Sequence, residues 1–194
     1  MDLPFILVLA SASPRRNQLL QAAGLQFEVR LPHAEETWPA GLELEKIPAY
    51  LAEKKAASVR NRDEPGEVIL GADTLVFLDG RVLGKPRDTT DAIRILESLS
   101  GRMHQVITGV CLLQGNRRIL FSEMTEVWFR NLEPDEIREY VLRYQPLDKA
   151  GAYAIQERIG ILGIEEIRGS YCNVMGLPVS QLVCALKSLA RQML

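Results

Sequence analysis

The feature that most constrains the fold is a short apolar run that leads directly into a helix start across the turn Ser11–Arg16. Residues 5–10 read FILVLA, which is typical of a strand buried on both faces. Residues 14–23 then have the pattern of a helix, with Ser13 suited to the N-cap and Pro14 to the first helical position. A strand that turns sharply into a helix is a building unit of α/β proteins.

The same turn is a candidate anion site. The unpaired N–H groups and the dipole at a helix start attract anions. Ser11 and Ser13 add hydroxyls, and Arg15 and Arg16 add guanidinium groups whose geometry matches phosphate oxygens. The alternative is a well-capped helix whose two arginines face solvent. This turn by itself leaves both interpretations open.

The rest of the chain mixes hairpins with strand–helix units. Asp79-Gly80 and Gly115-Asn116 are hairpin signals, each lying between apolar runs. We therefore predict an α/β protein with a mixed, twisted sheet flanked by helices. The expected elements are strands over 26–31, 68–78, 81–83, 104–113, 118–129 and 161–167, helices over 43–60 (regular from about 47), 89–100, 134–144 and 179–191, and a loop over 169–178.

Composition excludes some classes of function. The 194 residues suffice for one substantial α/β domain or two tightly joined lobes. A net charge of -2 provides no broad basic field, so we expect no nucleic-acid partner. The three cysteines are widely spaced and match no metal-ligand pattern, which predicts reduced thiols in a cytoplasmic protein. The sequence contains no run approaching the ~20 apolar residues that span a bilayer, so we expect no membrane partner.

One carboxylate interrupts the apolar run 68–78. Burying Asp73 there is costly unless its charge is paired or binds a cation. A structural explanation is that Asp73 caps a bulge or pairs with an arginine. A functional explanation is that it binds Mg²⁺ or acts as a general base.

Other polar residues are weaker candidates. Glu35 and Glu36 are adjacent in a proline-bounded loop, so at most one is expected to enter a pocket, and both could simply be solvated. Lys55 lies on a predicted helix, whereas Lys85 is held in a Gly-Lys-Pro turn and is either a phosphate clamp or a solvated lysine. Gln156 follows a stretch of small residues that would let a ligand approach the backbone. Together these residues predict an α/β enzyme that binds a phosphorylated ligand with a divalent metal.

Four segments, in order along nearly the whole chain, resemble the Maf-like nucleoside triphosphate pyrophosphatases, also called septum-formation inhibitors. These segments are LASASPRR (9–16), LGADT with LGKP (70–74 and 83–86), DKAGAYAIQ (148–156), and GSY followed by NVMGLP (169–171 and 173–178).

The resemblance implies one domain over residues 1–194, formed of two lobes around a deep cleft as in inosine triphosphatases, and a homodimer. It also implies hydrolysis of a nucleoside triphosphate between the α- and β-phosphates, with Mg²⁺ or Mn²⁺ as cofactor. Arg15 and Gln156 resemble the branch that acts on dTTP and UTP, whereas the 7-methyl-GTP branch tends to carry tryptophan at the position of Arg15. Roles in cell-division arrest and in cleaning the nucleotide pool are further implications of the resemblance.

The resemblance also implies roles for particular residues. Asp73 matches the catalytic carboxylate and Glu36 its metal-associated partner. Glu157 is a departure, because the family often has glycine there. The positions that match phosphate-binding residues are Ser13, Arg15, Arg16, Lys55 and Lys85, and those that match base-selecting residues are Arg15, Thr74 and Gln156.

Two alternative functions remain: a nucleotide-binding regulator of septum formation with little turnover, and a pyrophosphatase of modified purine nucleotides.

Overall fold

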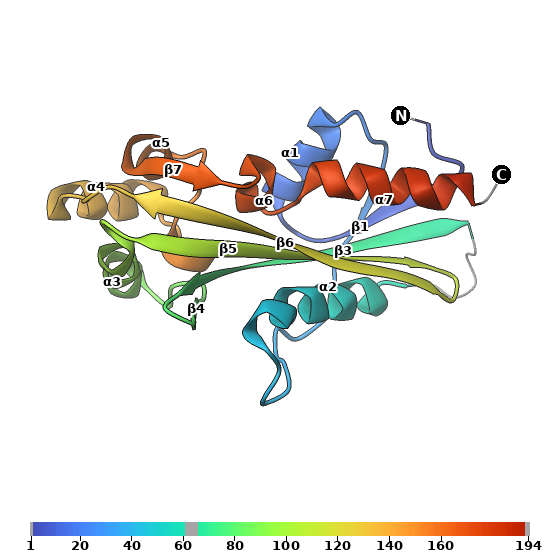
Figure 1. The fold of residues 1–194 in the computed structure, drawn as a ribbon, viewed down its shortest axis with the longest axis horizontal. Helices are drawn as coiled ribbons and strands as arrows, with labels where there is room; N and C mark the ends of the chain where they lie inside the picture. Colours follow the sequence, from blue (N-terminus) through green and yellow to red (C-terminus); the bar gives the residue numbers. More distant parts are fainter. Residues whose placement is uncertain (1, 61–65, 193–194) are drawn as a thin grey trace. The chain divides into compact units, whose positions relative to one another are not determined.

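The computed structural model describes residues 2–60 and 66–192. Within these ranges the chain forms a seven-stranded mixed sheet flanked by helices, in the order β2-β1-β3-β5-β6-β7 with β4 paired to β3 (Figure 1). The sheet does not close into a barrel, and the predicted fold class is confirmed. The strands are β1 Ile6–Ala10, β2 Glu28–Arg30, β3 Glu67–Leu78, β4 Arg81–Leu83, β5 Met103–Gln114, β6 Arg117–Phe129 and β7 Ile164–Arg168. The helices are α1 Pro14–Ala22, α2 Ile47–Ser58, α3 Thr89–Leu99, α4 Pro134–Tyr144, α5 Arg158–Gly163, α6 Tyr171–Met175 and α7 Val179–Arg191, with 3-10 turns η1 Leu44–Lys46 and η2 Ala150–Ala152.

The chain divides into two compact units, and three boundaries fall inside β3, β5 and β6, while the fourth follows α6. Unit 1 comprises the described parts of Met1–Asp73, Thr108–Glu123 and Gly176–Leu194, and unit 2 comprises Thr74–Ile107 and Met124–Met175. The predicted cleft and the single functional domain remain predictions.

In unit 1, α2 packs closely against β3. Helix α2 covers one face of the sheet, and α1 and α7 cover the other (Figure 1). A Cβ added to Gly71 on β3 would lie 2.1 Å from the carbonyl oxygen of Ala52 on α2. Any larger residue would therefore push the helix away. The glycine thus lets α2 bring the side chain of Lys55 next to Asp73 on β3.

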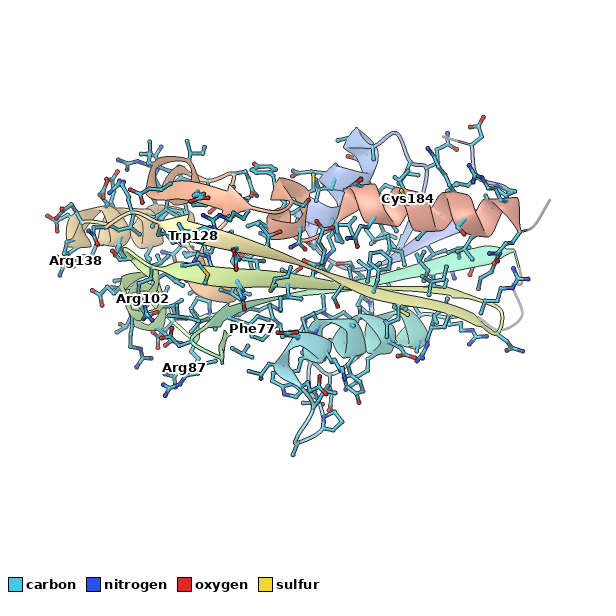
Figure 2. All side chains as sticks on the ribbon, in the orientation of Figure 1. Phe77, Arg87, Arg102, Trp128, Arg138 and Cys184 are labelled. Carbon is cyan, nitrogen blue, oxygen red and sulfur yellow. The ribbon has the colours of Figure 1, made fainter. Side chains whose placement is uncertain are left out.

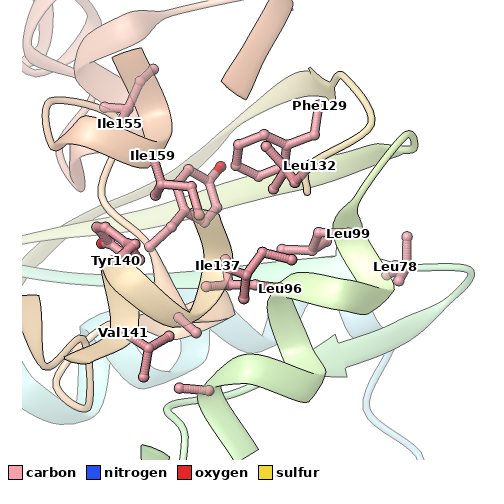
Figure 3. Close-up of a cluster of buried hydrophobic side chains, with 13 residues drawn as sticks. Leu78, Leu96, Leu99, Phe129, Leu132, Ile137, Tyr140, Val141, Ile155 and Ile159 are labelled. Carbon is pink, nitrogen blue, oxygen red and sulfur yellow. The ribbon is translucent and has the colours of Figure 1, made fainter. Parts of the chain in front are cut away.

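Unit 2 has its own apolar core, which Figure 3 shows in close-up. Leu96 and Leu99 of α3 pack with Ile137 and Tyr140 of α4, and all four side chains are buried. Helix α3 is capped by Asp88, since the backbone N–H of Asp91 donates to Asp88 Oδ1 over 2.7 Å. The predicted helices over 89–100 and 134–144 are therefore confirmed.

Several charged side chains on the surface of unit 2 form exposed ion pairs. The arginines labelled in Figure 2, Arg87, Arg102 and Arg138, are exposed and pair with nearby aspartates. Such exposed pairs contribute little to stability. They contrast with the buried charges of unit 1 described below.

Two predictions of local structure are wrong. Residues 161–163 belong to α5, so β7 begins at Ile164 rather than Ile161. The predicted loop over 169–178 contains the short helix α6. Both helices span fewer than two turns, which is too short for the helical period of apolar residues to show in the sequence.

A buried histidine lies in the core of unit 2. His104, on β5, is 1% exposed, and its Nε2 lies 2.7 Å from the hydroxyl of Tyr153. Its ring stacks on Phe129 with centroids 5.5 Å apart. Burial lowers the pKa of His104 from 6.5 to about 4, so the imidazole is neutral in the folded protein at neutral pH.

This pKa predicts a pH-dependent loss of stability. Between pH 6.5 and pH 4 the unfolded chain binds a proton at His104 and the folded chain does not, so the free energy of unfolding falls as pH falls. The full change is about 3 kcal/mol, from a difference of roughly 2.5 pKa units. Urea unfolding at pH 7 and pH 4.5 measures it. His104→Leu should have a smaller pH-dependent loss, while His33→Leu, which replaces the only other histidine and an exposed one, should behave like the unaltered chain. Equal losses in all three proteins would contradict the assignment.

Candidate active site

The candidate site of unit 1 begins where β1 ends beside its parallel partner β3. Strand β1 pairs in parallel with β3, with Ala10 opposite Gly71. The Ser11–Arg16 turn therefore leaves the sheet beside Asp73, which lies just after Gly71 within the longer strand β3. The carboxyl ends of parallel strands are where α/β proteins commonly bind ligands.

Hydrogen bonds hold the turn after β1. The backbone N–H of Ser13 donates to Ser11 Oγ over 3.2 Å, and Arg16 Nη1 donates to the same oxygen over 3.1 Å. Ser13 occupies the predicted N-cap position, but its side chain makes no capping hydrogen bond. Ser11 belongs to the candidate anion turn but not to the positions matched to phosphate-binding residues, and its hydroxyl is the one that accepts from Arg16. Its place at the start of the same turn was the only signal that the sequence offered for this contact.

Arg16 is a buried cation. It is 8% exposed, and its Nε donates to the carbonyl oxygen of Gly176 over 2.8 Å. Burial lowers the pKa of its guanidinium, and the negative charge of Asp73 opposes that change. The interpretation in which both arginines face solvent is therefore wrong for Arg16, while Arg15 beside it is half-buried.

Lys55 joins the two predicted catalytic carboxylates. Its Nζ lies 2.7 Å from Glu36 Oε1 and also donates to Asp73 Oδ1. The side chains of Lys55 and Asp73 are 11% and 8% exposed, whereas that of Glu36 is 45% exposed. The buried carboxylate thus pairs with a lysine rather than capping a bulge, and one face of this group is open to solvent.

The neighbours of Glu36 and Lys55 in the chain point elsewhere. Lys54 is half-buried and donates to the carbonyl oxygen of Thr37 over 2.9 Å. Glu35 is exposed. This agrees with the prediction that at most one of the two adjacent glutamates enters a pocket, since Glu36 is the one that pairs with Lys55.

The electrostatics of Asp73 suit a proton acceptor. Burial raises the pKa of its carboxyl above the ordinary value of 3.8, and Lys55 and Arg16 oppose this rise only in part. A carboxylate with a raised pKa is a stronger base than an ordinary aspartate. The arrangement can therefore take a proton from a water molecule next to a polyanion whose charge the nearby cations balance.

The remaining predicted site residues belong to unit 2. Thr74 is half-buried on β3, and Lys85 is exposed in the turn after β4. The backbone N–H of Gly151 donates to the carbonyl oxygen of Gly84 over 3.2 Å, so the Lys85 turn is joined to the segment that leads to Gln156. The Oε1 atom of Gln156 is buried and has no hydrogen-bond partner among the described residues. A buried acceptor of this kind is one that a ligand donor would satisfy.

The carboxylate oxygens of this site fit a divalent cation that is held together with substrate. In the described ranges, no group of three or more His, Cys, Asp and Glu side chains gathers as in a metal site built by protein alone. Glu36 and Asp73 nevertheless present carboxylate oxygens around one point, the Nζ of Lys55. Mg²⁺ prefers oxygen ligands and is commonly held by one or two carboxylates plus substrate phosphates.

Fold and site together define a mixed α/β protein with a charge-paired carboxylate group beside the carboxyl end of β1. The chain belongs to the Maf-like protein family, whose sequence profile matches residues 6–189. It is 52% identical over 184 residues to a dTTP/UTP pyrophosphatase of Phocaeicola vulgatus, covering 94% of this chain and 95% of that protein. A dTTP/UTP pyrophosphatase of Bacteroides thetaiotaomicron is 47% identical over the same shares, and one of Porphyromonas gingivalis is 46% identical over 93% and 92%.

Helix length bears on membrane insertion. None of the helices in residues 2–60 and 66–192 combines the length and apolar character needed to cross a bilayer.

Proposed function

We propose that this chain hydrolyses dTTP and UTP to the nucleoside monophosphate and pyrophosphate. The similarity to dTTP/UTP pyrophosphatases along nearly its whole length supports this substrate class. The observation that carries the chemistry is the buried Asp73 carboxylate, with a raised pKa, paired with Lys55 beside Glu36.

In the proposed reaction, Asp73 accepts a proton from a water molecule. The water oxygen forms a bond to the α-phosphorus, the bridging bond to the β-phosphate breaks, and its electron pair leaves with pyrophosphate. Glu36 and Asp73 would hold Mg²⁺ or Mn²⁺, which when bound supplies positive charge to the phosphate oxygens. Because the attack builds negative charge on those oxygens, preorganised cations lower the barrier. We assign this role to Arg15, Arg16, Lys55 and Lys85, with the hydroxyl of Ser13 as a further donor to phosphate.

Base selection is assigned to Gln156, together with Arg15 and Thr74. An amide offers one acceptor and one donor, which match the N3–H and O4 groups of a pyrimidine. The unpartnered Oε1 of Gln156 supports this assignment, since N3–H would supply the missing donor.

Replacing this amide should reduce selectivity. We expect Gln156→Leu to lower kcat/KM for UTP relative to that for GTP by about tenfold, which corresponds to one lost hydrogen bond. Pyrophosphate release from both nucleotides measures the ratio. Gln181→Leu, on the exposed surface of α7, is the matched control and should leave it unchanged. An unaltered ratio in Gln156→Leu would remove Gln156 from the base-selecting set.

The activity itself is tested with a panel of nucleoside triphosphates in the presence of Mg²⁺. We expect pyrophosphate release with dTTP and UTP well above that with other bases, and its loss on chelation of the metal. Tight binding without turnover would instead identify a nucleotide-binding regulator. Preference for 7-methyl-GTP or another modified purine would identify the other alternative.

Two further assignments accompany this proposal. The three cysteines are free thiols, as expected of a protein in the reducing cytoplasm. A homodimer is proposed from the family resemblance, and light scattering during size-exclusion chromatography would measure its mass.

A further inference from the structure

The residue after Gln156 makes an unusual set of contacts. Glu157 occupies the N-cap position of α5, and its side chain does not cap the helix. Its carboxylate instead turns to two buried groups: Oε2 accepts a hydrogen bond from the hydroxyl of Tyr140, and Oε1 lies 3.4 Å from Nζ of Lys149. In the sequence, Glu157 stands out only because the Maf-like family often has glycine at this position.

Both partners of this carboxylate are themselves held in place. Tyr140 is 1% exposed on α4, and its ring stacks on Tyr144 with centroids 4.9 Å apart. Lys149 is 7% exposed and also pairs with Asp148 over 2.8 Å. The Glu157 carboxylate therefore ties the start of α5 to the core of unit 2 on one side and to the start of η2 on the other.

These ties restrict the backbone on both sides of Gln156. The N–H of Glu157 donates to the carbonyl oxygen of Ala154 over 3.0 Å, which closes a tight turn around Gln156. Ile155, just before it, is 4% exposed in the core. With its neighbours held, Gln156 has little freedom beyond its own side-chain torsions. A site residue that is ordered before the ligand arrives loses less conformational entropy on binding.

We propose that Glu157 is a positioning residue that, through Tyr140 and Lys149, holds Gln156 ready for the pyrimidine base. The inference rests on the proposed function and deepens it. Glu157 acts here through its neighbour and makes no contact with the base itself.

Tyr140→Phe tests the inference with the smallest change. It removes the hydroxyl that Glu157 accepts from and keeps the ring. We expect KM for UTP to rise about tenfold, the scale of one hydrogen bond, with kcat within about twofold, and the UTP-to-GTP ratio of kcat/KM to fall. Tyr144→Phe, which removes a hydroxyl one turn further along α4, is the matched control and should leave all three quantities unchanged.

Substitutions at Glu157 give a second, independent readout. Glu157→Ala should reproduce the loss of selectivity, whereas Glu157→Gln keeps an acceptor for Tyr140 and should restore most of it. If these substitutions changed the melting temperature but left the UTP-to-GTP ratio of kcat/KM at its original value, Glu157 would have a merely structural role. That outcome would overturn this inference and leave the proposed function intact. If the unaltered chain releases no pyrophosphate from UTP, the proposed function and this inference fail together.

Discussion

Asp73→Asn should reduce pyrophosphate release from UTP by about a thousandfold and leave the protein folded. The loss follows from removal of the proton acceptor, since general-base catalysis contributes roughly 10²–10⁴ in rate. Stability should change little, because Lys55 keeps Glu36 as its partner and a neutral amide of the same shape avoids the cost of burying the Asp73 charge, which raises the pKa of that carboxyl. Steady-state turnover and the melting temperature, measured on the same preparation, check both halves of the prediction.

Asp79→Asn provides the control for this change. Asp79 lies in the hairpin turn after β3, where it is exposed and pairs with Arg102. Its substitution should keep turnover within about twofold, as is usual for an exposed ion pair. If Asp73→Asn retained turnover like that of the unaltered chain, Asp73 would not be the catalytic base.

Lys55→Met should lower both turnover and stability. It leaves two carboxylates, those of Glu36 and Asp73, near one another without the cation that pairs with both. Breaking a buried ion pair on one side costs about 3–5 kcal/mol. We therefore expect the free energy of unfolding at pH 8 to fall by about 3 kcal/mol, and turnover to fall by at least a hundredfold because a phosphate-neutralising charge is lost.

The stability defect of Lys55→Met should depend on pH. Lys55 lowers the pKa of Asp73, so its removal raises that pKa further above the value in the unfolded chain. A group with a raised folded-state pKa contributes stability at low pH that is lost as pH rises through that pKa. The defect should therefore be smaller at pH 5.5 than at pH 8, as measured by urea unfolding.

A double variant separates the two effects of Lys55. Lys55→Met combined with Asp73→Asn removes the unpaired buried charge, so most of the lost stability should return while turnover stays absent. Lys54→Met alters the neighbouring lysine, which is half-buried and contacts neither carboxylate in the hydrogen bonds it donates to Thr37, and should change neither quantity. A double variant no more stable than Lys55→Met would show that the defect comes from lost packing rather than from charge.

Much of the local structure could be predicted from the sequence. The strand–turn–helix at 6–22, the hairpins at Asp79-Gly80 and Gly115-Asn116, and the helices α3 and α4 all rest on local signals such as turn residues and helical spacing. The prediction failed at α5 and α6, where each helix is too short for a period to be visible. Within the site, the buried carboxylate at 73 was recognisable because a charge stands alone in an apolar strand.

Pairing in space could not be predicted. That Lys55 joins Glu36 to Asp73 depends on how closely α2 approaches β3 at Gly71, over a separation of 18 residues along the chain. That Arg16 donates to the carbonyl oxygen of Gly176, and that Glu157 turns to Tyr140, depends likewise on the packing of elements apart in sequence.

The sequence by itself thus determined the kinds of residue present and the elements that carry them, because propensity, capping and turn chemistry act over a few neighbouring positions. Only the tertiary structure decided which charges are buried together. Burial then set the pKa of Asp73, since desolvation depends on every group packed around a carboxylate and not on its neighbours in the chain.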